Sequence, residues 1–91
     1  MKVLKRGIMP DGTEIQIEDW NETYSFLSYG STIGAYPKNR YGETFRTSRD
    51  FENDKATEKV FEELINGTKT LRDLEFVIHS GGRILSYITQ L

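Results

Sequence analysis

A single helix pattern, at residues 54–66, most constrains the fold of this chain. Asn53 or Asp54 can cap its N-terminus, and Gly67 can adopt the positive φ that often ends a helix. At about 100° per residue, one half of the helical wheel is apolar and consists of Ala56, Val60, Phe61, Leu64 and Ile65. The sequence therefore predicts an amphipathic helix that begins at Asp54, ends at Asn66 and packs one face on a sheet.

The N-terminal residues predict a β-hairpin. Residues 3–9 and 13–18 flank Pro10-Asp11-Gly12, which has the residue types that a hairpin turn favours. Alternation at period 2 directs Ile15 and Ile17 to the core. The side chains between and beside them should face water, and they are Glu14, Gln16 and Glu18.

Two middle strands are expected after this hairpin, at residues 32–36 and 43–48. In the second strand, alternation places Phe45 toward the core and Arg46 toward solvent. Trp20, which lies between the hairpin and the middle strands, is predicted to cap the edge of the core, as lone tryptophans in small domains usually pack.

The C-terminal segment allows two interpretations. Thr70-Leu71-Arg72-Asp73 resembles a helix-capping sequence, whereas residues 76–78 and 84–89 are β-rich runs on either side of Gly81-Gly82. A Gly-Gly pair between such runs favours a two-residue hairpin turn. We therefore expect one helical turn at residues 70–74 followed by a closing hairpin, and the alternative is a helix that ends at Gly81.

Together these elements predict an α+β fold in a single domain, residues 1–91. The expected architecture is an antiparallel sheet of two hairpins plus the middle strands, with the helix packed on one face. A chain of 91 residues leaves no room for two independent cores. Because the other face of such a sheet stays partly wet, we expect a binding surface there.

Composition argues against most catalytic and metal-dependent functions. The chain has no cysteine, which excludes a disulfide, a thiol nucleophile and a thiolate metal site. The sole histidine, His79, has no nucleophile elbow around it, and the carboxylates lack the spacing of a calcium loop. We expect no catalytic residue, no metal and no cofactor. Without an apolar leader or a run of about 20 apolar residues, a cytoplasmic location without membrane contact is predicted.

Charge is unevenly distributed along the chain. Residues 36–49 contain four basic side chains against Glu43 alone, whereas residues 11–22 contain five acids and no base. Aromatic residues interleaved with cations can stack on bases while the cations contact phosphates. The candidate binding residues are Tyr36, Lys38, Arg40, Tyr41, Arg46 and Arg49. The same arginines could instead pair with neighbouring acids, which would neutralise this basic segment.

The favoured function is that of a small non-catalytic protein-interaction module. Its partner is expected to be a protein, and a second copy of the chain is one candidate. The first alternative is binding of nucleic acid or another polyanion through residues 36–49. The second alternative is a ribonuclease-type toxin, because small toxins of this length can work with Arg, Tyr, Lys and Glu in place of His.

The stretches Ile15-Gln16-Ile17-Glu18-Asp19-Trp20 and Thr32-Ile33-Gly34-Ala35-Tyr36-Pro37 resemble small uncharacterised proteins of conjugative transposons and phages of Gram-positive bacteria. Residues 24–27, 43–46 and 61–67 fit the same resemblance, which covers roughly half of the chain. The resemblance implies an accessory or host-interaction role in a mobile genetic element. It implies no activity, cofactor or catalytic residue.

Overall fold

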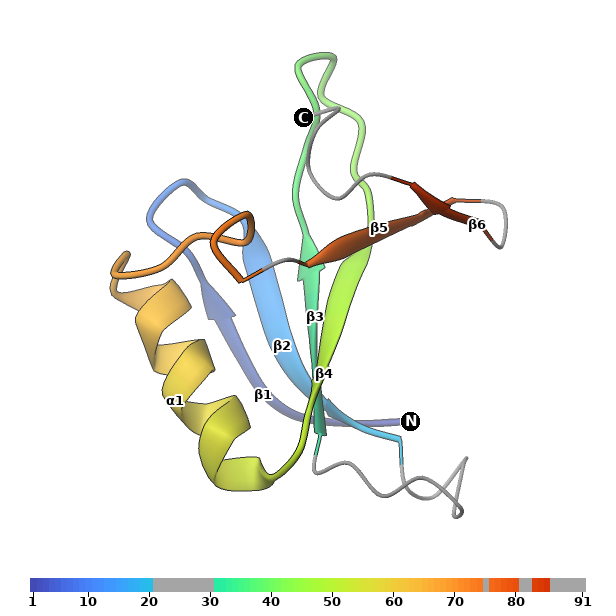
Figure 1. The fold of residues 1–91 in the computed structure, drawn as a ribbon. Helices are drawn as coiled ribbons and strands as arrows, with labels where there is room; N and C mark the ends of the chain where they lie inside the picture. The colour runs from blue at the N-terminus through green and yellow to red at the C-terminus, as the bar shows by residue number, and fades with distance from the viewer. Residues whose placement is uncertain (21–30, 75, 81–82, 86–91) are drawn as a thin grey trace.

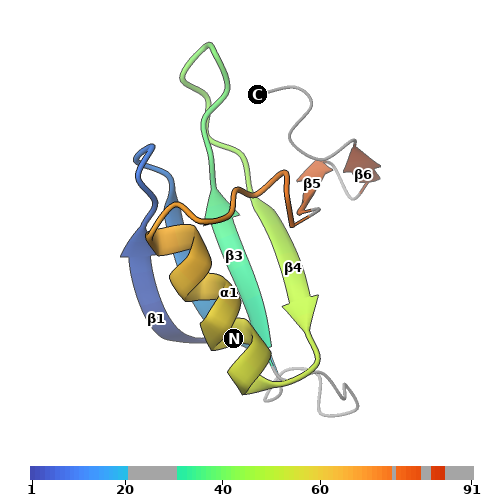
Figure 2. The ribbon, with the colours of Figure 1, turned by 60° about the vertical axis from the view of Figure 1, so that its left-hand side comes forward.

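The computed structural model describes residues 1–20, 31–74, 76–80 and 83–85. These residues form β1 (Lys2–Ile8), β2 (Glu14–Asp19), β3 (Ser31–Tyr36), β4 (Thr47–Phe51), α1 (Asp54–Ile65), β5 (Val77–Ser80) and β6 (Arg83–Leu85). The strands belong to one antiparallel sheet, in which the order across the sheet follows the order along the chain. The helix α1 lies against one face of this sheet (Figures 1 and 2). The predicted α+β class is confirmed.

The β1–β2 hairpin forms at the predicted place. The backbone N–H of Met9 donates to the carbonyl of Thr13 at 2.8 Å, and the N–H of Gly12 donates to the carbonyl of Met9 at 2.9 Å. Gly12 has a φ of 92°, which only glycine adopts without strain. The Asp11 side chain accepts the N–H of Thr13 at 2.9 Å and closes the turn. Local turn chemistry therefore fixes the register from Ile8 opposite Glu14 to Lys5 opposite Ile17, and the register shifts only beyond that point, between Val3 and Lys5.

The core lies between the sheet and α1. Residues of β2 and β3 contribute Ile15, Ile17, Ile33 and Ala35, and α1 contributes Phe61 and Leu64. The helix begins as predicted, because the side chain of Asn53 accepts the N–H of Ala56 at 2.8 Å. It ends before Gly67, whose φ is 82°. The apolar half of the wheel therefore faces the sheet as the sequence predicts.

The second middle strand begins later than predicted. The structure places β4 at Thr47–Phe51, whereas the sequence suggested residues 43–48. Pairing with β3 runs from Ala35 opposite Thr47 to Ser31 opposite Phe51, so Phe51 joins the core and Phe45 lies half-buried outside the strand. The residues before β4 instead belong to the hairpin around the turn at Asn39, described below, which has a bridge between Lys38 and Thr44 and a hydrogen bond from the Phe45 N–H to the Pro37 carbonyl.

The C-terminal segment follows the first of the two interpretations. Thr70 and Asp73 cap each other, since the N–H of Thr70 donates to Asp73 Oδ2 at 3.0 Å and the N–H of Asp73 donates to Thr70 Oγ1 at 3.2 Å. After this turn, β5 pairs with β4 and then with β6. A hairpin is therefore confirmed and a helix ending at Gly81 is wrong. The Gly81-Gly82 turn itself lies outside the described residues.

Candidate functional site

The sheet face opposite α1 carries a polar cluster, which we define as Gln16, Glu18, Trp20, Tyr36 and Arg46. Alternation along β2 and β3 explains its position, because the neighbours of these residues in sequence, such as Ile17 and Ala35, face the helix. Arg46 immediately precedes β4 and reaches the same face. The cluster therefore joins two central strands and the end of the β3–β4 hairpin.

Glu18 lies at the centre of the polar cluster and has no exposed surface. Its two carboxylate oxygens accept hydrogen bonds from Arg46 Nη2 at 2.6 Å and from Arg46 Nη1 at 2.9 Å. Gln16 Nε2 donates to it at 2.6 Å, and Trp20 Nε1 donates at 3.0 Å. Four donors satisfy the carboxylate, which makes burial of the charge tolerable. The prediction that Glu18 faces water is wrong for this reason.

Gly34 makes the ion pair between Glu18 and Arg46 possible. It lies on β3 opposite Gln16, and a Cβ at this position would stand 2.5 Å from Glu18 Oε2 and 2.7 Å from Arg46 Nη1. Real carbon atoms do not approach oxygen or nitrogen that closely. Because Gly34 has no side chain, it leaves the space through which Arg46 crosses β3 to reach Glu18 on β2.

Tyr36 supports Arg46 from the side. The tyrosine hydroxyl accepts hydrogen bonds from Arg46 Nη1 at 2.8 Å and from Gln16 Nε2 at 3.2 Å. The guanidinium also lies over the ring, 5.6 Å from its centroid. Arg46 retains 35% of its side-chain exposure, but its charge is directed at a buried carboxylate. Arg46 thus lies on the sheet face predicted for it, but its guanidinium is directed at Glu18 and not at solvent.

The surroundings of the ion pair shift both pKa values toward the charged forms. Burial alone would raise the pKa of Glu18, but hydrogen bonds from Arg46, Gln16 and Trp20 and the charge of Arg46 outweigh it and hold this pKa below the ordinary 4.5. Hydrogen bonding to Glu18 raises the pKa of Arg46, against the effect of burial. The pair is thus ionised at neutral pH.

Trp20, expected at the edge of the core, contributes its indole N–H to this polar cluster.

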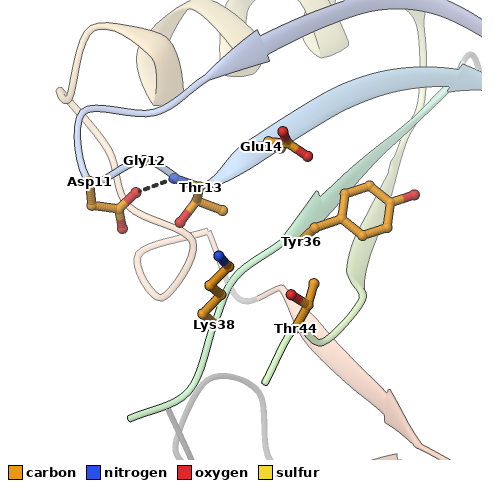
Figure 3. Close-up of a pocket in the computed structure, with 7 residues that line it drawn as sticks. All are labelled: Asp11, Gly12, Thr13, Glu14, Tyr36, Lys38 and Thr44. Atoms are coloured by element: carbon orange, nitrogen blue, oxygen red, sulfur yellow. Dashed lines mark hydrogen bonds between the residues drawn. The ribbon is translucent and has the colours of Figure 1, made fainter. Parts of the chain in front are cut away.

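Two shallow hollows adjoin the polar cluster and share Glu14 and Tyr36. The first, of about 590 Å³, lies between the β1–β2 turn and the β3–β4 hairpin. Figure 3 shows Lys38 extending toward that turn from the opposite wall. The second, of about 530 Å³, lies over β1 and β2. Among the described residues, no group of three His, Asp or Glu side chains could hold a metal ion.

A hydrogen-bonded turn forms the tip of the β3–β4 hairpin, which projects beyond the end of the sheet (Figure 1). Asn39 organises it, because its side-chain oxygen accepts the N–H groups of Tyr41 and Glu43, each at 2.9 Å. The Asn39 N–H donates to the Glu43 carbonyl at 2.9 Å, and Gly42 adopts a φ of 81°. The turn displays Tyr41, which is 72% exposed, with the Arg40 guanidinium 5.1 Å from its ring centroid.

The six predicted binding residues do not form one surface. Tyr36 and Arg46 belong to the polar cluster, Lys38 lines the first hollow, and Arg40 and Tyr41 form the tip. Arg49 is opposite Ile33, so it lies on the face that carries α1, where it contacts the Phe51 ring and the Leu74 carbonyl. Arg46 and Arg49 are three positions apart, so alternation along the extended chain directs them to opposite faces.

Sequence reasoning missed the importance of Glu18 and Gly34. One sequence signal was available, because an isolated glycine inside a strand pattern often marks a close approach of another group. Nothing local predicted which group approaches, since Arg46 is 28 residues from Glu18. Glu14 and Asp11, which line the first hollow, were also outside the predicted site.

No helix in the described part of the chain is long and apolar enough to cross a membrane. Comparison of the sequence and fold with models of protein families, with curated proteins and with solved structures finds no match.

Proposed function

We propose that this chain is a small non-catalytic protein-interaction module that contacts its partner through Arg40 and Tyr41 at the β3–β4 tip. The observation that carries the proposal is the exposure of Tyr41, 72%, on a turn whose backbone is fixed by Asn39. A large aromatic side chain held in solvent contributes nothing to the core of the fold. Tyr and Arg are also the residue types that most often dominate binding energy at protein interfaces.

Preorganisation of the tip strengthens this proposal. Binding usually costs free energy because side chains and loops must be ordered, and a loop already fixed in one conformation avoids much of that cost. Here three backbone hydrogen bonds and the Asn39 side chain hold the turn. Arg40 lies against the Tyr41 ring, so the two side chains present a compact amphipathic surface.

The arrangement of charges favours a protein partner over a polyanion. Glu18 compensates the charge of Arg46, and Arg49 lies on the other face of the sheet. Of the four basic residues in the segment, only Lys38 and Arg40 are then left to contribute to a cationic surface at the β3–β4 hairpin. Polyanion binding usually needs several adjacent cations on one surface. The resemblance to proteins of mobile elements supports an accessory role and is compatible with a protein partner.

The proposal predicts that an Arg40→Ala/Tyr41→Ala variant loses its partner. We expect at least a tenfold lower recovery of the partner by quantitative affinity capture, because hot-spot truncations cost about 2 kcal/mol or more. Arg72→Ala, which removes an exposed arginine elsewhere, is the matched control and should retain the partner. Equal recovery with both variants would contradict the proposal.

Titration of labelled single-stranded RNA and DNA separates this proposal from the polyanion alternative. Phosphate-driven binding weakens steeply between about 50 and 200 mM salt. Salt-sensitive binding that requires Arg40 would contradict the proposed protein partner and favour a nucleic acid as the ligand. We expect no such binding.

A further inference from the structure

The strand β1 has a free outer edge in the part of the chain that the structure describes. β1 pairs only with β2 and stands at the end of the strand order. Figure 2 shows α1 in front of the sheet and β1 at its left margin, with no described element beyond it. An edge of this kind presents backbone donors and acceptors that another strand can pair with.

The hairpin register identifies the open backbone groups. Met9 donates its N–H to Thr13, so the hydrogen-bonded positions of β1 alternate from Met9 to Gly7, opposite Ile15, and to Lys5, opposite Ile17. The intervening residues, Arg6 and Ile8, therefore direct their N–H and C=O groups away from β2. These groups are the ones an added strand would meet.

Side chains beside this edge are unusually apolar for an exposed strand. Leu4 is 51% exposed and Ile8 is 61% exposed, and Arg6 lies between them on the strand. The second hollow, of about 530 Å³, is next to Ile8 and Arg6 and extends to Tyr36. An added strand would thus find apolar contact and room for a side chain, as well as backbone hydrogen bonds.

Charge selects among the strands that could be added. β1 contains Lys2, Lys5 and Arg6 and no acid. Lys5 pairs with Glu62 at 3.2 Å, but Arg6 makes no ion pair within the described residues. Two copies of β1 related by a two-fold axis would bring basic side chains together, which disfavours pairing with a second copy. The same charges attract an acidic strand, so they distinguish a partner from self-association.

We propose that the outer edge of β1 accepts an extended segment of a partner protein in which apolar and acidic side chains alternate. Its backbone pairs with Arg6 and Ile8. One of its carboxylates meets the Arg6 guanidinium, and an apolar side chain covers Ile8 beside the second hollow. This surface is separate from the β3–β4 tip, so either of the two proposals can be disproved without affecting the other.

The blocked peptide VEVEVEV is a direct probe of this edge. We expect this peptide to bind saturably to the full chain. In ¹⁵N–¹H NMR spectra recorded during the titration, the largest chemical-shift changes should occur at the Arg6 and Ile8 amides. The lysine peptide VKVKVKV should bind at least tenfold more weakly. Absence of saturable VEVEVEV binding up to roughly 1 mM, or equal binding of both peptides, overturns the proposal.

Two variants test the backbone and charge contributions separately. Ile8→Pro removes an N–H that β2 does not use, and proline is tolerated on strand edges, so the fold should persist while peptide binding falls at least tenfold. Arg6→Glu should exchange the preference from VEVEVEV to VKVKVKV. Arg72→Glu, which changes an exposed arginine outside β1 and the tip in the same way, is the matched control and should leave peptide affinity within about twofold of wild type.

The spectra of all variants and sedimentation of the free protein complete the test. A folded Ile8→Pro protein with unchanged affinity overturns the edge proposal, and so does wild-type self-association that Arg6→Glu strengthens or abolishes. If Ile8→Pro fails to fold, the charge exchange in Arg6→Glu decides the question alone. None of these results bears on the Arg40 and Tyr41 proposal, whose partner capture is a separate measurement.

Discussion

Arg46→Met should lower the free energy of unfolding by about 3–5 kcal/mol at pH 7, because removing one partner of a buried ion pair leaves the other charge without compensation. Glu18 is fully buried and would keep only the donors of Gln16 and Trp20. Methionine has a similar length, so the loss reflects the guanidinium more than the packing of its stem. Urea unfolding followed by circular dichroism measures this change.

Arg40→Met is the matched control for that experiment. It makes the same chemical change at an exposed position, where a substitution usually alters stability by less than about 0.5 kcal/mol. Similar losses in both variants would show that the Glu18–Arg46 pair does not stabilise the fold as its geometry indicates.

The pH dependence of stability should differ in sign between wild type and Arg46→Met. In wild type, the pKa of Glu18 lies below its ordinary value of 4.5, so the stabilisation is present above that pH and is lost as the pH falls through the folded-state pKa. In Arg46→Met, burial dominates and we expect the Glu18 pKa to rise above the unfolded value. The variant should therefore gain stability on acidification from pH 7 toward 5, where wild type is unchanged. Parallel curves for the two proteins would be inconsistent with this assignment.

Gly34→Ala should destabilise the fold by about 1–3 kcal/mol, the usual cost of an added methyl group in a fully packed site. Its Cβ would stand 2.5 Å from Glu18 Oε2 and 2.7 Å from Arg46 Nη1, and the two side chains hold each other in place. Thermal or urea unfolding of the purified variant gives the measurement.

A double-mutant cycle with Glu18→Ala identifies the cause of that loss. Without the carboxylate, Arg46 is free to move toward solvent, and the added methyl group meets no fixed atom. The cost of Gly34→Ala should then disappear or reverse, since alanine is favoured over glycine within a strand by about 0.5–1 kcal/mol. A cost that is the same in both backgrounds would mean that backbone strain, and not the ion pair, opposes alanine.

Elements determined by neighbouring residues could be predicted from sequence. The Asn53 cap and Gly67 delimit α1, and Pro10-Asp11-Gly12 sets the first hairpin, because these devices act within a few residues of one another. β4 begins later than predicted, at Thr47, and the residues before it form a turn in which the Asn39 side chain accepts two backbone N–H groups. The geometry of this turn, and with it the start of β4, is not encoded by the alternation of residue types.

The candidate site was predicted less well than the fold. Alternation correctly placed Glu18 on the face away from α1, but that face is covered at this position by Arg46 and Trp20. An arginine remote in sequence therefore changes an expected surface acid into a buried one. The residues of the basic segment are divided between the two faces of the sheet, because Arg46 pairs with Glu18 on the face away from α1 and Arg49 lies opposite Ile33 on the other face. Tyr41, a candidate binding residue, is 72% exposed at the tip.

The order of strands also matters while the chain is being synthesised. Because neighbours in the sheet are neighbours along the chain, each hairpin can close as soon as its second strand leaves the ribosome, without waiting for a distant segment. The apolar face formed by Ile15, Ile17 and Ile33 nevertheless stays uncovered until α1 emerges. The interval between completion of β4 and docking of α1 is thus the period in which a nascent chain is most exposed to aggregation and to chaperones.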